Sequence, residues 1–206
     1  MKIWVTGAGG CLGSCVAKAV TARGYELLAT THWECPIEDL GCVTRIAQVA
    51  APEVIINCAG ALPGTFALDM VKVNSLGPYI LSSLAMRGIR IVHMSTDCVF
   101  SGTRNVPHAS DEAPDPTDLY GRSKLAGEVE APNVLNVRGS FISKKAGFLR
   151  WLTHAEDEVE AWDQASWTGS TVEVVAEKLV ELAEGELTGV VPVSYTHLTL
   201  PTTPYV

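Results

Sequence analysis

The sequence lacks an excess of basic residues, and it also lacks any long apolar run. Its 206 residues include 15 Lys and Arg against 23 Asp and Glu, which gives a formal net charge of −8. Without a basic block, we expect neither nucleic acid nor an anionic membrane surface as a partner. Apolar runs such as residues 54–56 are far too short to span a membrane. Hydrophobic residues still make up 47% of the chain, which excludes a disordered polymer.

Signals for export and for disulfide or zinc chemistry are missing as well. Lys2 is followed at once by a strand-like run, so no secretory signal is expected and the protein should be soluble and cytoplasmic. No C-x-x-C pair occurs and no His neighbours Cys11 or Cys15, so we predict no metal site. The better expectation is a set of buried free thiols. The six cysteines are Cys11, Cys15, Cys35, Cys42, Cys58 and Cys98.

The end of the chain lacks charge altogether. Residues 193–206, VSYTHLTLPTTPYV, contain no Lys, Arg, Asp or Glu and show no helical period. Residues 193–202 resemble a translated sequencing adapter, and the alternative is an extended C-terminal tail. We therefore leave this segment out of the fold prediction. We expect the natural protein to continue differently beyond about residue 192, so that this chain is a truncated form.

Strand-like and helix-like segments alternate through the first two thirds of the chain. We expect strands at 3–6, 25–30, 53–57, 89–95 and 134–138, and helices at 12–23, 43–50, 68–86 and 120–130. This alternation predicts an α/β fold, namely a Rossmann-like doubly wound parallel sheet with helices on both faces. Gly77 and Pro78 predict a bend within the longest helix.

A glycine-rich loop joins the first strand to the first helix. Residues 6–13 read TGAGGCLG. In a dinucleotide site Gly7 permits the tight turn, Gly10 lets the backbone approach a pyrophosphate, and Gly13 allows close helix–strand packing. The N–H groups at the helix start would bind the phosphates. We therefore predict a dinucleotide site rather than a purely structural turn, with contacts at Gly7, Gly10, Cys11, Leu12 and Gly13.

After residue 138 the alternation weakens, with helices expected at 148–154 and 171–183 and a strand at 189–193. The predicted organisation has three parts. Residues 1–138 form the dinucleotide-binding Rossmann domain. Residues 139–192 form a partial, truncated substrate-binding lobe with a returning helix and strand. Residues 193–206 are the artefactual tail.

The end of the second strand does not separate NAD from NADP clearly. An acid there would bond the ribose 2′-OH of NAD, whereas a basic residue would hold the 2′-phosphate of NADP. The segment at this point, which contains Thr30, Thr31 and His32, provides neither. Because no acid is present to repel a phosphate, the sequence weakly favours NADP.

Tyr120 and Lys124 lie four residues apart and would share one face of a helix. A free tyrosine hydroxyl has a pKa of about 10 and exchanges protons poorly at neutral pH. A nearby ammonium group would favour the phenolate and lower the pKa of Tyr120 towards neutrality. The plainer alternative is a tyrosine that starts a helix and a solvated lysine, and the spacing alone does not exclude it.

Further polar residues follow strand ends, at the sheet edge where open parallel sheets bind ligands. Thr96 follows the fourth strand, and its hydroxyl would hydrogen-bond a substrate carbonyl. Asn74, in the preceding helix, would hold water or backbone near Lys124. The third strand ends in Asn57, Cys58, Ala59 and Gly60. Several such features on one fold favour a catalytic site over separate caps and turns.

These segments resemble those of extended short-chain dehydrogenases/reductases, in particular dTDP-4-dehydrorhamnose reductases and their sugar-nucleotide-binding relatives. The resemblance rests on TGAGGCLG, VIINCAG, VKVNSLGPY, HMSTDCVFSG and DLYGRSKLAGE, and it extends to about residue 192. It implies a catalytic set of Thr96, Tyr120 and Lys124. Tyr120 would donate the proton, Lys124 would tune it and hold the nicotinamide ribose, and Thr96 would orient the carbonyl.

The chain departs from this family at several positions of the implied site. The acidic residue that often holds adenine is Pro36 here, and Ile37 is kept beside it as part of the cofactor site. Where the family often has an aromatic residue after Ser-Thr-Asp, this chain has Cys98. Where the family has a tryptophan in the substrate loop, this chain has Phe141. These changes leave the identity of the sugar open. The implied substrate-binding residues are Thr96, Asp97, Cys98 and Phe141.

The leading interpretation is an NAD(P)H-dependent reductase of a nucleotide-activated 4-keto sugar, with Tyr120 as proton donor. A sugar-nucleotide epimerase or dehydratase would use the same residues and a further acid–base group, for which Asp97 and His93 are candidates. A non-catalytic regulatory subunit that binds the cofactor is the third interpretation. Such relatives often lose the tyrosine or the lysine, and both are present here. The resemblance also allows a homodimer.

Overall fold

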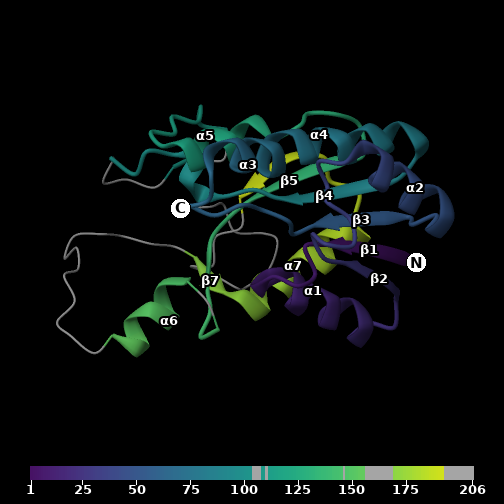
Figure 1. The fold of residues 1–206 in the computed structure, drawn as a ribbon, viewed down its shortest axis with the longest axis horizontal. Helices are drawn as coiled ribbons and strands as arrows, with labels where there is room; N and C mark the ends of the chain where they lie inside the picture. Colours follow the sequence, from purple (N-terminus) through teal and green to yellow (C-terminus); the bar gives the residue numbers. More distant parts are fainter. Residues whose placement is uncertain (104–107, 110, 146, 156–168, 193–206) are drawn as a thin grey trace.

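The computed structural model describes residues 1–103, 108–109, 111–145, 147–155 and 169–192 (Figure 1). Its centre is a six-stranded parallel sheet in the order β2-β1-β3-β4-β5-β8. The order reverses between β1 and β3, which is where doubly wound sheets bind their ligands. The predicted α/β class is confirmed. The strands are β1 (Lys2–Thr6), β2 (Glu26–Thr30), β3 (Val54–Asn57), β4 (Arg90–Met94), β5 (Val134–Arg138) and β8 (Gly189–Pro192).

Helices cover both faces of this sheet (Figure 1). Side chains alternate across each strand, so Val5 faces the core beneath one layer of helices and Trp4 faces the core beneath the other. The first layer consists of α1 (Cys11–Ala22) and α7 (Val172–Glu184). The second contains α2 (Leu40–Ala50), α3 (Ala67–Val71), α4 (Gly77–Ser82) and α5 (Leu119–Ala126). Among the described residues, no helix is long and apolar enough to cross a bilayer.

The predicted long helix is one helical run with changes of geometry. A π-helical turn, η1 (Lys72–Leu76), separates α3 from α4, and a 3-10 turn, η2 (Ser83–Arg87), follows α4. Pro78 has no N–H to donate to the carbonyl of Asn74, so the regular hydrogen-bond ladder is interrupted here. A Cβ on Gly77 would lie 2.5 Å from Cδ1 of Ile37, which explains the glycine.

Helix α5 is shorter than the helix predicted at 120–130, because it ends at Ala126. Its start is capped by Asp118, whose carboxylate accepts a hydrogen bond of 2.7 Å from the Gly121 N–H. The chain turns at Gly127, where a Cβ would overlap the carbonyl oxygen of Asn74. Close packing against η1 therefore sets the end of this helix, which helical periodicity alone does not reveal.

The prediction of buried thiols is wrong for most of the cysteines. All six are free, but only Cys35 is buried and Cys98 is exposed. Cys98 lies in the 3-10 turn η3 (Asp97–Val99), beyond the buried part of β4. Strand burial therefore does not extend to this residue.

A small second sheet lies apart from the main one. It pairs β6 (Phe141–Ile142) with β7 (Ser170–Thr171) in parallel, and α6 (Gly147–His154) follows β6. The chain then returns through α7 and β8 to the main sheet. Residues 156–168 of the predicted substrate lobe lie outside the described residues, as does the predicted artefactual tail.

Candidate active site

The glycine loop forms a cradle of backbone between β1 and α1. Gly7 has a φ of +64°, and a Cβ on it would lie 2.6 Å from the Ala59 nitrogen. A Cβ on Gly13 would overlap the Gly7 carbonyl oxygen, so both positions require glycine. Gly10 precedes α1 as its N-cap and offers no capping side chain. The residues present therefore fit a dinucleotide, with the α1 N–H groups available for its phosphates.

The ends of β1 and β2 are tied together beside this cradle. The Ala8 N–H donates to the Thr30 carbonyl at 3.0 Å. The Thr30 side chain is buried and accepts a 2.8 Å hydrogen bond from Nε1 of Trp4. Thr31 directs both its N–H and its hydroxyl to Oε2 of Glu34, each at 2.8 Å. The sequence-based prediction included Thr30 and Thr31 but missed Glu34.

Asn74 connects three segments of the predicted site. Its amide oxygen accepts from the Ala61 N–H at 2.8 Å, and its amide nitrogen donates to the Ala61 carbonyl at 2.9 Å and to the Ser123 hydroxyl at 3.0 Å. A Cβ on Gly60 would lie 3.6 Å from the Asn74 Oδ1 and 4.0 Å from the Lys124 Nζ. Asn74 is fully buried and therefore fixes the loop after β3 against α5.

Lys124 lies at this edge with its ammonium group buried. Its Nζ donates a 2.7 Å hydrogen bond to the Met94 carbonyl, and the residue is 4% exposed. Burial lowers the pKa of Lys124 to about 8, while Glu128 and then Cys58 act in the opposite direction. Charge on this lysine is therefore sensitive to any group that enters the site.

Tyr120 and Thr96 meet at the same edge. The Thr96 hydroxyl accepts from the Cys98 N–H at 3.1 Å and donates to Oδ1 of Asp97 at 3.3 Å. Burial raises the pKa of Tyr120, against a lowering by the nearby Thr96 hydroxyl. The expectation that Lys124 lowers the pKa of Tyr120 is wrong for this structure, because the ammonium group bonds to the Met94 carbonyl instead.

A buried ion pair supports this arrangement, and the sequence-based prediction did not include it. Arg138 donates through Nε at 2.9 Å and Nη2 at 2.7 Å to the Glu128 carboxylate, and the Ser95 hydroxyl donates to the same carboxylate at 2.6 Å. The Arg138 guanidinium also lies 5.3 Å from the centre of the Phe100 ring. Glu128 follows Lys124 by four residues, so sequence reasoning would treat it as a surface ion-pair partner.

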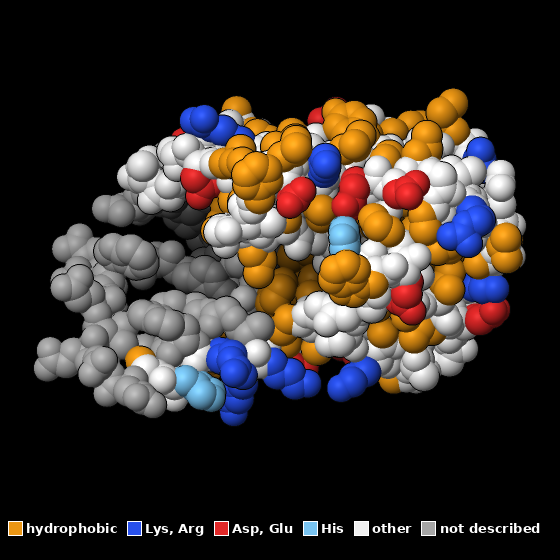
Figure 2. All heavy atoms as spheres, viewed as in Figure 1, with side chains coloured by type: hydrophobic (Ala, Val, Ile, Leu, Met, Phe, Trp, Pro, Cys, Tyr) orange, Lys and Arg blue, Asp and Glu red, His pale blue; other side chains and the backbone are white. Residues whose placement is uncertain are grey.

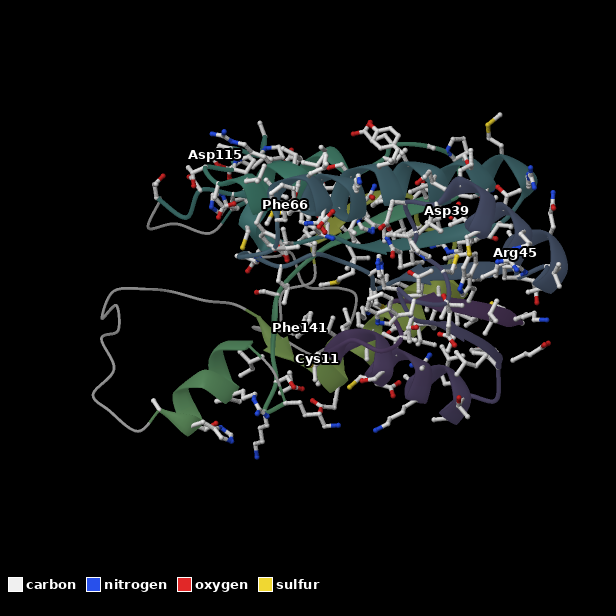
Figure 3. All side chains as sticks on the ribbon, in the orientation of Figure 1. Cys11, Asp39, Arg45, Phe66, Asp115 and Phe141 are labelled. Atoms are coloured by element: carbon white, nitrogen blue, oxygen red, sulfur yellow. The ribbon has the colours of Figure 1, made fainter. Side chains whose placement is uncertain are left out.

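Two of the predicted contact residues have their side chains in the core, and a third packs against it. Leu12 is 5% exposed, so only its backbone is available to a cofactor. Ile37 is 2% exposed and packs against α4 at Gly77. Phe141 packs against the same core as Cys11, and Figure 3 shows both residues on the α1 side of the sheet. The buried Ile37 side chain is therefore not available to a ligand, and the Phe141 side chain lies against the core.

The remaining predicted substrate residues lie beside Thr96. The Asp97 carboxylate accepts from the hydroxyls of Thr96 at 3.3 Å and of Ser140. Cys98 is exposed, and its thiol lies 3.8 Å from Oδ1 of Asp97. Burial is the main cause that raises the pKa of Cys98. This thiol is therefore protonated near neutral pH and acts as a small polar surface rather than a nucleophile.

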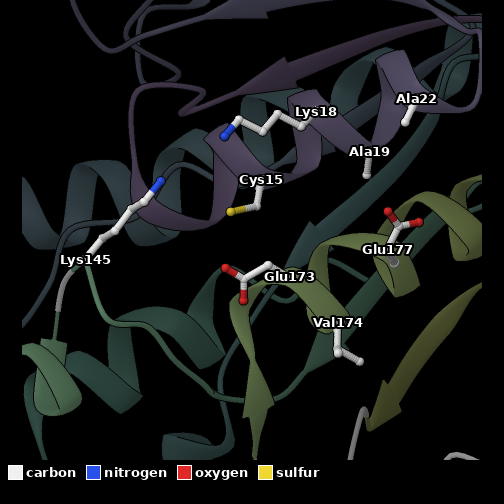
Figure 4. Close-up of a pocket in the computed structure, with 8 residues that line it drawn as sticks. All are labelled: Cys15, Lys18, Ala19, Ala22, Lys145, Glu173, Val174 and Glu177. Atoms are coloured by element: carbon white, nitrogen blue, oxygen red, sulfur yellow. The ribbon is translucent and has the colours of Figure 1, made fainter.

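A hollow of about 340 Å³ lies elsewhere, between α1 and α7 (Figure 4). None of the predicted site residues lines it, and its wall carries charges of both signs. Among the described residues, no cluster of three His, Cys, Asp or Glu side chains would hold a metal ion. The hollow is lined by Cys15, Lys18, Ala19, Ala22, Lys145, Glu173, Val174 and Glu177.

The fold and this edge define a Rossmann-type protein of the extended short-chain dehydrogenase/reductase class, with Thr96 just after β4 and with Tyr120 and Lys124 on α5. The model of the RmlD substrate binding domain family matches residues 1–199. The chain belongs to this family.

Curated relatives support the same family. A dTDP-4-dehydrorhamnose reductase of Mycolicibacterium smegmatis is 38% identical over 133 residues, which is 62% of this chain and 40% of that protein. One of Mycobacterium tuberculosis is 30% identical over 207 residues, with 91% of this chain and 67% of that protein covered. Methionine adenosyltransferase 2 subunit beta of Danio rerio is 32% identical over 139 residues, covering 63% of this chain and 43% of that protein. The chain therefore spans only 40% to 67% of these relatives.

Solved structures share the fold. A dTDP-4-dehydrorhamnose reductase from Clostridium acetobutylicum superposes with a TM-score of 0.86 at 25% identity, covering 94% of this chain and 74% of that one. A Bacillus anthracis reductase solved with NADP has a TM-score of 0.79 at 22% identity, with the same coverage. The Bordetella bronchiseptica enzyme WbmG, solved with NAD and UDP, has a TM-score of 0.78 at 22% identity, covering 93% and 72%. Neighbours of this fold thus include both NADP and NAD complexes.

Proposed function

We propose that this protein reduces a keto group of a nucleotide-activated sugar with a nicotinamide dinucleotide, and that the group is the 4-keto group of a deoxyhexose. The observation that carries the proposal is the buried Lys124 ammonium group, which bonds to the Met94 carbonyl at 2.7 Å at the sheet edge that also holds Thr96 and the glycine loop. Family membership and relatives named as dTDP-4-dehydrorhamnose reductases support the class of substrate. The residues proposed to bind the dinucleotide and those proposed to bind the sugar therefore lie at one edge of the sheet.

The proposed roles follow from the position of each side chain. When bound, the nicotinamide supplies a hydride to the carbonyl carbon. Tyr120 transfers its hydroxyl proton to the carbonyl oxygen, and the Thr96 hydroxyl orients that oxygen by a hydrogen bond. Lys124 holds the nicotinamide ribose, since its ammonium group is buried at this edge. The glycine loop and the start of α1 hold the pyrophosphate.

The two alternatives differ in what they require of the same edge. An epimerase or dehydratase needs a further acid–base group, for which Asp97 and His93 are the candidates. His93 is 1% exposed and its Nδ1 pairs with the Asn57 amide nitrogen at 2.9 Å, inside the sheet. The Asp97 carboxylate already accepts hydrogen bonds from the hydroxyls of Thr96 and Ser140. A non-catalytic subunit is suggested by the relative from Danio rerio. It needs neither the tyrosine nor the lysine, whereas Tyr120 and Lys124 are both present here. Reduction fits these contacts better.

The test is dinucleotide oxidation with dTDP-4-keto-6-deoxy sugars, compared between the wild type and Tyr120→Phe. Loss of the proton donor should reduce kcat by about a hundredfold or more, while dinucleotide binding is retained. Tyr25→Phe is the matched control, since Tyr25 precedes β2 at the opposite end of the strands and its hydroxyl bonds to Glu184 at 3.1 Å. If the wild type binds dinucleotide but reduces no keto-sugar nucleotide, the reductase proposal is rejected in favour of a binding subunit.

We also propose a cytoplasmic location and a homodimer. The six free thiols are consistent with a reducing compartment.

The proposed homodimer rests on an exposed apolar surface. Figure 2 shows hydrophobic side chains gathered over α3 and α4, and exposed apolar surface of this kind is typical of subunit contacts. Light scattering of the purified chain measures the oligomeric state directly. The exposed residues there are Leu68, Val71, Leu76, Tyr79 and Met86.

A further inference from the structure

The carboxylate of Glu34 lies at the end of β2. The sequence prediction found no acid there, because it considered only residues 30–32. Residues 31–35 form a tight turn, in which the N–H groups of Glu34 and Cys35 donate to the Thr31 carbonyl at 3.2 and 3.0 Å. The turn directs the Glu34 carboxylate back to Thr31, whose N–H and hydroxyl both bond to Oε2. The carboxylate is therefore held at the strand end.

This strand end lies directly against the glycine loop. The Ala8 N–H donates to the Thr30 carbonyl, and a Cβ on Gly9 would lie only 3.1 Å from Cγ2 of Thr31. In Rossmann folds the group that follows the second strand contacts the adenosine ribose and decides between its 2′-hydroxyl and a 2′-phosphate. Glu34 is placed for that role by two hydrogen bonds and not by its position in the sequence alone.

The surroundings of Glu34 favour a hydroxyl over a phosphate. Both bonds from Thr31 lower the pKa of Glu34, so this carboxylate is ionised at neutral pH. Residues 31–39 contain three acidic residues and no Lys or Arg. Within the described part of the chain, Arg45 directs Nη2 to the Cys42 thiol at 3.6 Å, and Nδ1 of His32 lies 3.9 Å from Oε1 of Glu38. Both nearby basic groups therefore already face other partners.

We propose that Glu34 makes this protein selective for NAD(H) over NADP(H), by accepting a hydrogen bond from the ribose 2′-hydroxyl and by repelling a 2′-phosphate. This inference rests on the proposed function, because it assigns a choice between dinucleotides to the site that binds them. It replaces the weak preference for NADP, which considered residues 30–32 alone. The turn at residues 31–35 brings the Glu34 carboxylate to the strand end, although Glu34 lies beyond residues 30–32 in the sequence.

The test measures dissociation constants of NADH and NADPH for the full chain by titration calorimetry, without any sugar. The wild type should bind NADH at least about tenfold more tightly than NADPH, because the 2′-phosphate meets a like charge. In Glu34→Gln the amide oxygen can still accept from Thr31 but carries no charge, so the ratio should fall to within about threefold, mainly through tighter NADPH binding. Glu34→Arg should reverse the preference.

The matched control is Glu26→Gln, which removes the same charge at the opposite end of β2 and should leave the ratio unchanged. Raising salt from about 0.05 to about 0.5 M should narrow the wild-type ratio but not that of Glu34→Gln, because the repulsion at this exposed carboxylate is screened. Equal binding of both dinucleotides to the wild type, or an unchanged ratio in both Glu34 variants, overturns the inference. Binding of neither dinucleotide to the folded wild type overturns the proposed function as well.

Discussion

Two of the residues proposed to bind the cofactor are more deeply buried than two of those proposed to bind the substrate. Lys124 and Asn74 are buried between the main sheet and its helices, and each is fixed by hydrogen bonds to backbone. Cys98 is exposed in a 3-10 turn, and Phe141 opens a sheet of two-residue strands. The residues proposed for catalysis therefore lie on the buried sheet and its helices, while most of the residues proposed for substrate binding lie on less buried segments.

Breaking the buried support should have the largest effect. Glu128→Gln leaves the Arg138 guanidinium, whose side chain is 9% exposed, without a counter-charge. Removal of one partner of a buried pair typically costs about 3–5 kcal/mol of the free energy of unfolding, and urea denaturation measures this loss. In the control Glu181→Gln, the lost partner is the surface Lys178, so the loss should stay below about 0.5 kcal/mol. Equal losses in the two variants would contradict a supporting role for Glu128.

The burial of Lys124 should be visible as a pH dependence of the free energy of unfolding at alkaline pH. Its pKa is lowered from 10.5 to about 8 in the fold. In this window the unfolded chain binds a proton that the folded chain has released, so the contribution of Lys124 to stability rises with pH and is smallest below about 8. Relative to Lys124→Met, the wild type should gain on the order of 2 kcal/mol between about pH 8 and about pH 10.

The Lys124 comparison also needs a surface control, because thiols and tyrosines titrate in the same pH range. Urea unfolding of Lys178→Met at each pH supplies it. Lys178 lies in a surface ion pair, so its difference from the wild type should not change across this range. If the difference in free energy of unfolding between the wild type and Lys124→Met does not change with pH, the buried ammonium group keeps an ordinary pKa.

The smallest effect on stability is expected on the substrate side. Cys98→Ser replaces an exposed thiol that bonds only weakly to Asp97, so the free energy of unfolding should change by less than about 0.5 kcal/mol. If Cys98 contacts the sugar, KM for the keto-sugar nucleotide should change while KM for the dinucleotide stays constant. Steady-state kinetics with each substrate varied in turn separates the two values. A change in dinucleotide KM alone would place Cys98 on the cofactor side.

Prediction from the sequence succeeded for elements whose signal is local. The parallel strands were found within one or two residues, since buried strands are short apolar runs bounded by polar or glycine residues. It failed at the end of α5, where Gly127 packs against the Asn74 carbonyl, 53 residues earlier in the chain. It also failed for the environment of Tyr120, which depends on the Met94 carbonyl that takes the lysine hydrogen bond.

The sequence by itself determined the α/β class, the glycine loop and the four-residue spacing of Tyr120 and Lys124, because periodicity and short spacings act within one element. Only the tertiary structure decided which charges meet. It placed Glu128 with Arg138 and turned Glu34 back to Thr31. Such contacts depend on how separate strands and turns pack, and electrostatic energies change steeply with distance and burial.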